Sequence, residues 1–347
     1  MNLRVVLLLK LIAVSCGALP AAPRAIAGQV AYDSPRGRVE VLGLHRWTLA
    51  MLQDSVRHYV RGQELYDAAC MVTLRDSLHF ADASVERFEM TSPGRPTRSF
   101  LTIKVVEPEQ AARVQWDTRP RNEFSSLLPD YAPLILPMTD SAGGLWRGPL
   151  LDWLQYADTA RRRQAVSAAS ADARADAARI FAFLGARHAE SDRKRAMRVL
   201  ASDGFWANRM AASVVLANFA AHDSTWTVLV RALRDPHEGV REVAQVVLGT
   251  LPARRIDWRA SAADFRLLLG GTNLRAMRGV FDLLARTEVA PELARSLLHE
   301  NADWLLDHLA SESPMSAESA HRLLVRLNDG RDLGHARAAW AAWTQAL

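Results

Sequence analysis

The sequence is poor in cysteine and lysine. It contains two cysteines, Cys16 and Cys70, and lysine stands only at positions 10, 104 and 194, so that nearly all basic residues are arginine. We interpret the shortage of lysine as a compositional bias. Because Cys16 falls in a segment that we expect to be removed, no intrachain disulfide can form. Cys70 lies one helical turn before Leu74 in an apolar stretch, which favours a buried thiol over a reactive one.

Recognisable catalytic motifs are also lacking. There is no Gly-x-Ser-x-Gly elbow, no phosphate-cradling loop and no Cys-x-x-Cys pair. Asp76, Ser77 and His79 stand too close together in the sequence to form a catalytic triad. We therefore predict no catalytic residue and no bound cofactor.

One segment comes near a metal-site pattern. His299-Glu300-Asn301-Ala302-Asp303 has the spacing of a zinc-protease helix, but that helix needs a histidine where Asp303 stands. Asp307 and His308 would add possible ligands one and two turns further on. We interpret the segment as a solvated helix face and predict no metal site.

The N-terminus has the pattern of an export signal. Arg4 precedes an apolar run over 5–14, and Ala25-Ile26-Ala27 is a small-residue cleavage site. Lys10 interrupts the run, which is shorter than the ~20 residues that a membrane span needs. We therefore expect residues 1–27 to be a signal peptide, cleaved after Ala27, and the mature chain to be secreted or periplasmic. Lipid attachment at Cys16, within a loose lipobox, is the alternative.

Charge gives little support for nucleic-acid binding. Removal of the signal takes away Arg4, Lys10 and Arg24 and no acidic residue, which lowers the formal charge from +5 to +2. The basic clusters at 161–163 and 193–195 lie among Ala and Asp on expected helices, and no aromatic residues alternate with them. We interpret them as solvated faces.

Residues 28–116 are expected to form a small α+β domain. Val39 and Val41 alternate with polar residues in a half-buried strand that ends at Gly43. Apolar spacing predicts helices over 49–59 and 64–78, broken at Arg61-Gly62. Strands are expected over 80–88 and 101–105, separated by a turn at 92–96. The predicted order is strand, helix, helix, strand, strand.

This order and several stretches of residues resemble the POTRA domain, a small periplasmic module of outer-membrane assembly and transport proteins. The matching stretches are 39–44, the break at Gly62, 80–85 and 101–108. The resemblance covers about residues 37–108 and implies that a partner could bind by adding a strand to an exposed sheet edge. An unclassified α+β domain remains the alternative.

Residues 117–149 form the next segment. It contains five prolines and three glycines, a density that favours an extended connector. The apolar residues 134–136 and Trp146 are expected to pack on a neighbouring domain.

A helical hairpin is predicted around residue 235. Trp226, Leu229, Val230 and Leu233 have the spacing of one apolar helix face. Asp235 can cap a second helix and Pro236 suits its first position. The second helix then carries an apolar stripe, with Ala244 small enough for a close helix contact. Its members are Val240, Ala244, Val247, Leu248 and Leu251.

The hairpin pattern recurs at an interval of thirty-two residues. Arg209, Ala212 and Leu216 repeat the spacing of Arg241, Ala244 and Leu248. A further thirty-two residues back, Leu184-Gly185 matches Leu248-Gly249, although Ile180 stands where the second helix has the small Ala244. Beyond the clearest repeat the interval loosens, with Gly279 and Leu283 thirty-five residues on. An ordinary amphipathic bundle could also contain one such hairpin, but repetition favours a stack.

Residues 150–347 therefore resemble a HEAT-repeat array, closest to the short-repeat bacterial kind. The motif residues are Asp235, Pro236, Val240, Arg241, Ala244, Leu248 and Gly249. In that family, the Asp and Arg at the positions of Asp235 and Arg241 help to link successive repeats. In the repeat that contains Arg209, we place Gly204 and Phe205 at the positions of the Asp-Pro pair. The expected fold class is mainly α, an α-solenoid of HEAT-like hairpins preceded by the α+β domain.

Two classes of function are compatible with the sequence. The first is an exported, non-enzymatic scaffold of the bacterial cell envelope that binds protein partners on its repeat surface or sheet edge. The second is an enzyme or enzyme subunit, because some short HEAT-like repeat proteins resemble lyases that attach bilins. A deep polar cleft with perturbed acid or histidine residues would favour the enzyme, and a shallow groove the scaffold.

Overall fold

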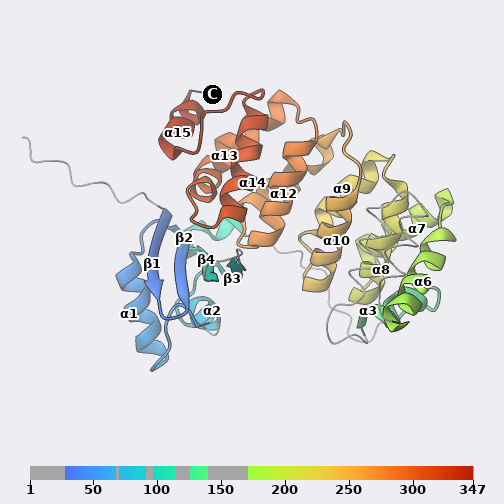
Figure 1. Cartoon of the computed structure of the whole chain (residues 1–347), viewed down its shortest axis with the longest axis horizontal. Helices are drawn as coiled ribbons and strands as arrows, with labels where there is room; N and C mark the ends of the chain where they lie inside the picture. Colours follow the sequence, from blue (N-terminus) through green and yellow to red (C-terminus); the bar gives the residue numbers. More distant parts are fainter. Residues whose placement is uncertain (1–27, 68–69, 91–96, 115–125, 140–170, 347) are drawn as a thin grey trace, which may run out of the picture.

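The computed structural model describes residues 28–67, 70–90, 97–114, 126–139 and 171–346 (Figure 1). Within these ranges the chain is mainly helical, as expected, and it contains a small mixed sheet near the N-terminus with four strands, one more than predicted. The predicted signal over 1–27, the turn at 92–96, Trp146 and the arginines 161–163 lie outside the described residues.

The sheet contains β1 (Gly28–Ser34), β2 (Gly37–Leu44), β3 (Asp82–Met90) and β4 (Arg98–Val106). Its order is β1-β2-β4-β3, with β2 and β4 parallel and the other pairs antiparallel. From β2 onward the order strand, helix, helix, strand, strand is the predicted one. Strand β1 was not predicted, because Gln29, Tyr32 and Asp33 leave no alternating apolar pattern. It adds an edge to the sheet beside β2.

Two helical segments cover one face of the sheet. They are α1 (Leu49–Tyr59) and α2 (Cys70–Val72), which continues as a π-helical turn over Thr73–Ser77. The second helix is therefore shorter than the predicted 64–78. Beneath the helices lies a fully buried apolar cluster, formed by alternate strand residues that include Val39, Val41 and Ile103.

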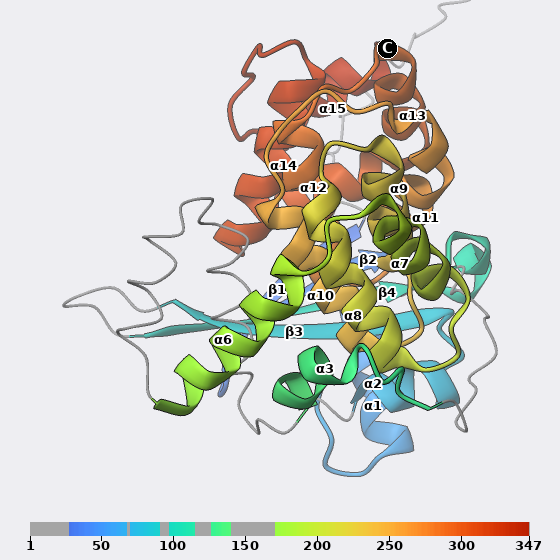
Figure 2. The same ribbon diagram turned by 90° about the vertical axis from the view of Figure 1, so that its right-hand side faces the viewer.

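The opposite face of the sheet is buried as well, which corrects the prediction of half-buried strands. Glu40, Thr102 and Lys104 are at most 4 % exposed, although alternation with Val and Ile suggested that they face solvent. They pack against α12 (Leu274–Arg286), α13 (Pro291–Leu309) and the start of α14 (Pro314–Leu327). Figure 2 shows the sheet edge-on, with these helices above it and α1 and α2 below.

The helices from α7 (Glu190–Ser202) onward form two rows, in which each helix contacts the next member of its own row. Consecutive helices alternate between the rows. The first row is α7 (Glu190–Ser202), α9 (Asp223–Ala232), α11 (Ala262–Gly270), α13 and α15 (Arg337–Gln345). The second is α8 (Trp206–Leu216), α10 (Glu238–Thr250), α12 and α14.

Short 3₁₀ turns lie at Pro108–Arg113, Ala217–Phe219 and Trp258–Ser261.

The predicted connector is not extended throughout. Ala132–Thr139 forms helix α3, which packs against α6 (Ala171–Gly185) and α8. Tyr131, Leu134 and Ile135 are buried in the same apolar core as the helical rows. The expectation that residues 134–136 pack on a neighbouring part of the chain is thus met at Leu134 and Ile135.

One apolar core runs through the helical rows, from α3 to Trp340 on α15. A helix inside these rows packs apolar side chains against neighbouring helices on both sides. Among the described helices, none is long and apolar enough to cross a membrane.

Candidate binding cleft

A buried ion pair between successive hairpins joins Arg209 on α8 to Asp235 in the loop before α10. Arg209 Nε and Nη2 donate to the two carboxylate oxygens of Asp235 at 2.8 and 2.9 Å. Both side chains are buried, at 5 % and 0 % exposure. Asp235 also accepts from the backbone N–H of His237 at 2.9 Å. Asp235 therefore connects the loop before α10 to helix α8 of the preceding hairpin.

Arg241 repeats the backbone contacts of Arg209. Its Nη1 donates to the carbonyl oxygens of Asp235 and Pro236, and Nη1 of Arg209 donates to those of Asp203 and Gly204. Asp203-Gly204 thus occupies the place of Asp235-Pro236. This corrects the expectation that Gly204 and Phe205 stand there, since a thirty-two-residue interval reaches positions 203 and 204.

The other motif residues lie on α10 and at its start. Val240, Ala244 and Leu248 are buried, as the apolar stripe predicts. The helix begins at Glu238 rather than at Pro236, and His237 is its N-cap. Gly249 is exposed, and a side chain there would meet no atom within 4 Å. Close packing therefore explains Ala244 but not Gly249.

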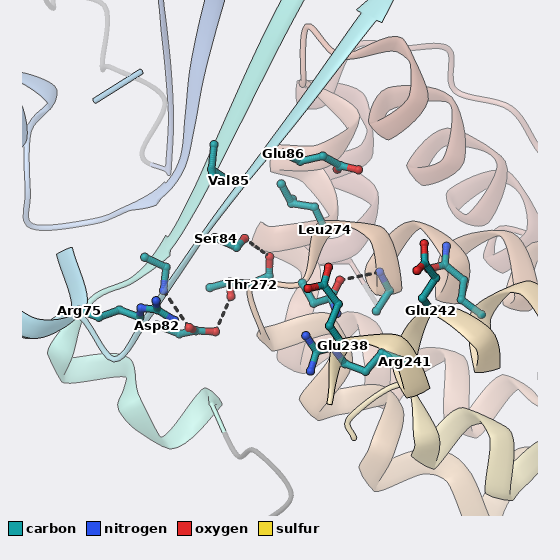
Figure 3. A pocket seen from close by; sticks show the side chains of 14 residues that line it. Arg75, Asp82, Ser84, Val85, Glu86, Glu238, Arg241, Glu242, Thr272 and Leu274 are labelled. Carbon is teal, nitrogen blue, oxygen red and sulfur yellow. Dashed lines mark hydrogen bonds between the residues drawn. The ribbon is translucent and has the colours of Figure 1, made fainter. Parts of the chain in front are cut away.

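A polar cleft of about 260 Å³ lies between the sheet and the helical rows (Figure 3). Strand β3 forms one wall and α10 the other, while the loop at Thr272 and Asn273 and the start of α12 lie between them. Arg75, at the π-helical turn, lines the same space. The cleft thus brings together an edge strand of the sheet and a helix of the second row.

The wall formed by β3 is tied to the loop before α12. Thr272 donates its hydroxyl proton to Asp82 Oδ2, and Ser84 Oγ donates to the Thr272 carbonyl oxygen. Asp82 Oδ1 accepts from the backbone N–H of Ala83. Burial raises the pKa of Asp82, against the opposing effect of the hydrogen bond from Thr272. Further along β3, Glu86 contacts Arg278 of α12.

The wall formed by α10 carries charges of both signs. Glu238 and Glu242 lie one turn apart and both line the cleft, beside Arg241 and Gln245. Burial lowers the pKa of Arg241, whose charge also acts on Asp82 across the cleft. Gln245 also lines a second hollow over α12 and α14 that contains the exposed Met315. The sequence predicted a role for Arg241 only in linking hairpins and did not predict that it lines a cleft. No pattern in the sequence indicated that β3 would approach α10.

The remainder of the sheet is held by buried polar contacts outside the cleft. Glu40 accepts from Ser311 Oγ at 2.6 Å and from the backbone N–H of Glu312 at 2.9 Å. Lys104 has no exposed surface, and its ammonium nitrogen lies 4.3 Å from the centre of the Trp304 ring. Burial lowers the pKa of Lys104 well below its usual value. These contacts fix the sheet against α13 and α14, so β3 has a defined position beside α10.

The residues that resemble a zinc-protease helix do not converge. His299 and Asp303 are exposed on α13, whereas Asp307 and His308 are 2 % and 0 % exposed in the core. The expectation of a solvated face is therefore wrong for Asp307 and His308. Burial raises the pKa of Asp307 to about 6, and Arg337 opposes the rise from 3.3 Å. No cluster of three metal-ligating side chains occurs within the described ranges.

Cys70, which the sequence left as a possible nucleophile, is buried. Cys70 has no exposed surface, and its thiol donates to the Leu65 carbonyl oxygen at 3.1 Å. Burial raises its pKa to about 12. The thiol therefore behaves as the small buried side chain that the sequence predicts.

Comparison with models of known protein families gives no match for this chain. A comparison with curated protein sequences gives no match either.

Proposed function

We propose that this protein is an exported, non-enzymatic scaffold of the bacterial cell envelope, whose C-terminal helices are a HEAT-like array. In this proposal, the cleft between β3 and α10 binds a segment of a protein partner. In this cleft the edge strand β3 meets helix α10, which the proposal assigns to the helical-repeat surface. That meeting is the observation on which the proposal rests.

The position of β3 supports binding by strand addition. In the sheet order β1-β2-β4-β3, strand β3 stands at one end and, among the described residues, pairs with β4 alone. Within the described ranges, no backbone hydrogen bond joins β3 to a segment outside the sheet. An edge strand offers a row of N–H and C=O groups that an extended segment can pair with. The cleft provides space beside this edge.

The chemistry of the cleft supports binding over catalysis. Among the residues that the structure describes, no histidine or cysteine lines it. Asp82 is the acid there with a raised pKa, but both of its oxygens already accept hydrogen bonds. A proton-transfer group needs an atom within reach of the substrate. The raised pKa of Asp82 meets one part of the criterion for an enzyme, but because its two oxygens are occupied we propose binding rather than proton transfer in this cleft.

Site-specific photo-crosslinking tests the proposal. A benzophenone amino acid at Gln245, which lines the cleft, should capture a partner from the envelope fraction of the source cells. The same amino acid at Glu292, on an exposed part of α13, is the matched control. Mass spectrometry identifies the adducts, and excess unlabelled protein should suppress the adduct formed at position 245. Identical adducts from both positions would show that the cleft is not the binding surface.

A further inference from the structure

We infer that His308 makes the contact between the sheet and helices α12 and α13 sensitive to acid: when its imidazole takes up a proton, the sheet separates from these helices and the cleft between β3 and α10 comes apart. The consequence for partner binding rests on the proposed function, whereas the separation itself does not.

His308 lies on the side of α13 that holds the sheet. One turn before it, the ring of Trp304 faces the ammonium group of Lys104 on β4, with the nitrogen 4.3 Å from the ring centre. Three residues after it, Ser311 Oγ donates to Glu40 on β2 at 2.6 Å. Residues one helical turn apart share a face of a helix. The histidine thus stands between two contacts by which the helices hold the sheet.

The surroundings of the His308 ring suit only its neutral form. The side chain has no exposed surface, and the ring packs edge-on against that of Phe281 on α12, with the centres 5.4 Å apart. Among the residues that the structure describes, neither Nδ1 nor Nε2 has a hydrogen-bond partner. An imidazolium carries two N–H donors, and a buried charge without acceptors is costly. Protonation therefore requires the ring to reach water.

The charges around His308 oppose a further positive charge. Burial lowers the pKa of His308 well below its usual value, and Lys104 on β4 and Arg278 on α12 lower it further. Helix α13 also packs against α11, α14, α15 and β1. Charged side chains of these elements form ion pairs with other residues: Arg266 with Glu300, Asp264 with Arg234, Arg322 with Asp282, His321 with Asp332, Arg337 with Asp307, and Asp33 with Arg38. A proton on His308 would therefore add an uncompensated charge beside two basic groups.

The pH interval follows from the state in which the ring reaches water. A solvated histidine has a pKa near about 6.5. Because the docked state holds His308 at a lower pKa, it binds fewer protons, and the free energy that favours docking falls as the pH drops below about 6.5. Asp307 acts in the opposite sense over part of this interval, since its pKa is raised to about 6. Variants that keep Asp307 isolate the effect of His308.

The contact at Lys104 is directly connected to the cleft. Lys104 stands opposite Ser84 of β3 in the sheet register, and Ser84 lines the cleft and donates to the Thr272 carbonyl oxygen. The two walls belong to different parts of the chain, β3 to the sheet and α10 to the helical rows. Separation of the sheet from α12 and α13 would therefore draw β3 away from α10.

Energy transfer between two fluorescent labels tests the separation in the mature chain. One label is attached at Asp54→Cys on α1 and the other at Glu292→Cys on α13, positions with 78 % and 81 % exposed side chains, and Cys70 is replaced by Ala. As the pH is lowered from about 7.5 to about 5, transfer should fall with native His308 and recover on neutralisation. The far-UV circular dichroism of the helices should persist throughout.

Three further variants assign the effect. His308→Phe keeps a buried ring that cannot take up a proton, and His308→Gln is a smaller neutral replacement. In both, transfer should stay constant over the same pH interval. His299→Gln is the matched control, because His299 is exposed on the same helix, and it should behave as the protein with native His308 does. Constant transfer with native His308, an equal fall in the two His308 variants, or a loss of helical signal in parallel with transfer would overturn the inference.

Photo-crosslinking at Gln245 at the two pH values separates the inference from the proposed function. Capture of the partner should be lost at about pH 5 with native His308 and kept in His308→Phe. Transfer that falls while capture at position 245 continues would leave the inference standing and overturn the assignment of the cleft as the binding surface.

Discussion

Arg209 and Asp235 form a bidentate ion pair that links two consecutive hairpins and is almost completely buried. Its geometry explains why an aspartate stands before α10. The carboxylate holds the arginine of the preceding hairpin and, at the same time, the backbone N–H of His237. Removal of one partner leaves the other charge buried without compensation.

Asp235→Asn should therefore lower the free energy of unfolding by roughly 3–5 kcal/mol, measured by urea denaturation. Asp257→Asn is the control, because Asp257 pairs with Arg259 at 48 % and 86 % exposure and such pairs contribute up to about 1 kcal/mol. The double variant Arg209→Met with Asp235→Asn should lose less than the sum of the two single losses. Additive losses would contradict a direct link between the hairpins.

Ala244 tests the close packing of α10. The residue has no exposed surface, so Ala244→Leu should overpack the core and cost roughly 1–3 kcal/mol. Ala338→Leu adds the same atoms at an exposed position on α15 and should change stability by no more than about 0.5 kcal/mol. Thermal unfolding of the two variants gives the comparison. Equal shifts in melting temperature would argue against the repeat packing.

Lys104 should destabilise the fold at neutral pH. Burial lowers its pKa in the folded state, while the unfolded chain keeps a pKa near about 10.4. Stability therefore rises with pH between the folded and unfolded pKa values. Lys104→Met should increase the free energy of unfolding near pH 7 by roughly 1–4 kcal/mol, and the gain should shrink toward about pH 10.

Lys194→Met is the control for this prediction, because Lys194 is exposed on α7. Urea denaturation at several pH values should show no such pH-dependent gain for that variant. A loss of stability in Lys104→Met at neutral pH would mean that contact with the Trp304 ring outweighs the cost of burial.

Asp307 should give the opposite pH dependence in the acid range. Its folded pKa of about 6 lies above the usual value of 3.8. The folded state thus binds the proton more tightly, and stability falls as pH rises through this interval, by up to about 3 kcal/mol. Asp307→Asn should remove this part of the pH profile, whereas Asp303→Asn, exposed one turn earlier on α13, should retain it. Parallel profiles for the wild type and Asp307→Asn would refute the assignment.

Cys70 should be unreactive in the folded protein. Because burial raises its pKa to about 12, a thiol reagent such as Ellman's reagent should not modify it near pH 8 until urea unfolds the chain. The measurement is the rate of thiol release with and without denaturant. Rapid modification of the native protein at Cys70 would reopen the role of a reactive thiol.

Local patterns in the sequence determined much of the helical part. The spacing of Trp226, Leu229 and Val230 predicted the buried face of α9, and Ala244 and Leu248 predicted that of α10. These predictions hold because helix periodicity places such residues on one side whatever the neighbour is. The order of elements from β2 to β4 followed from similar local signals.

Only the tertiary structure decided what covers the second face of the sheet and what approaches α10. Alternation in β2 and β4 suggested that Glu40 and Lys104 face water, yet helices from more than 170 residues further along the chain bury both. The same docking brings Asp82 on β3 to Thr272 and sets β3 beside α10. A sequence pattern records polarity at each position, but burial depends on which distant surfaces pack together, and partners such as Ser311 and Trp304 make buried charge tolerable in this fold.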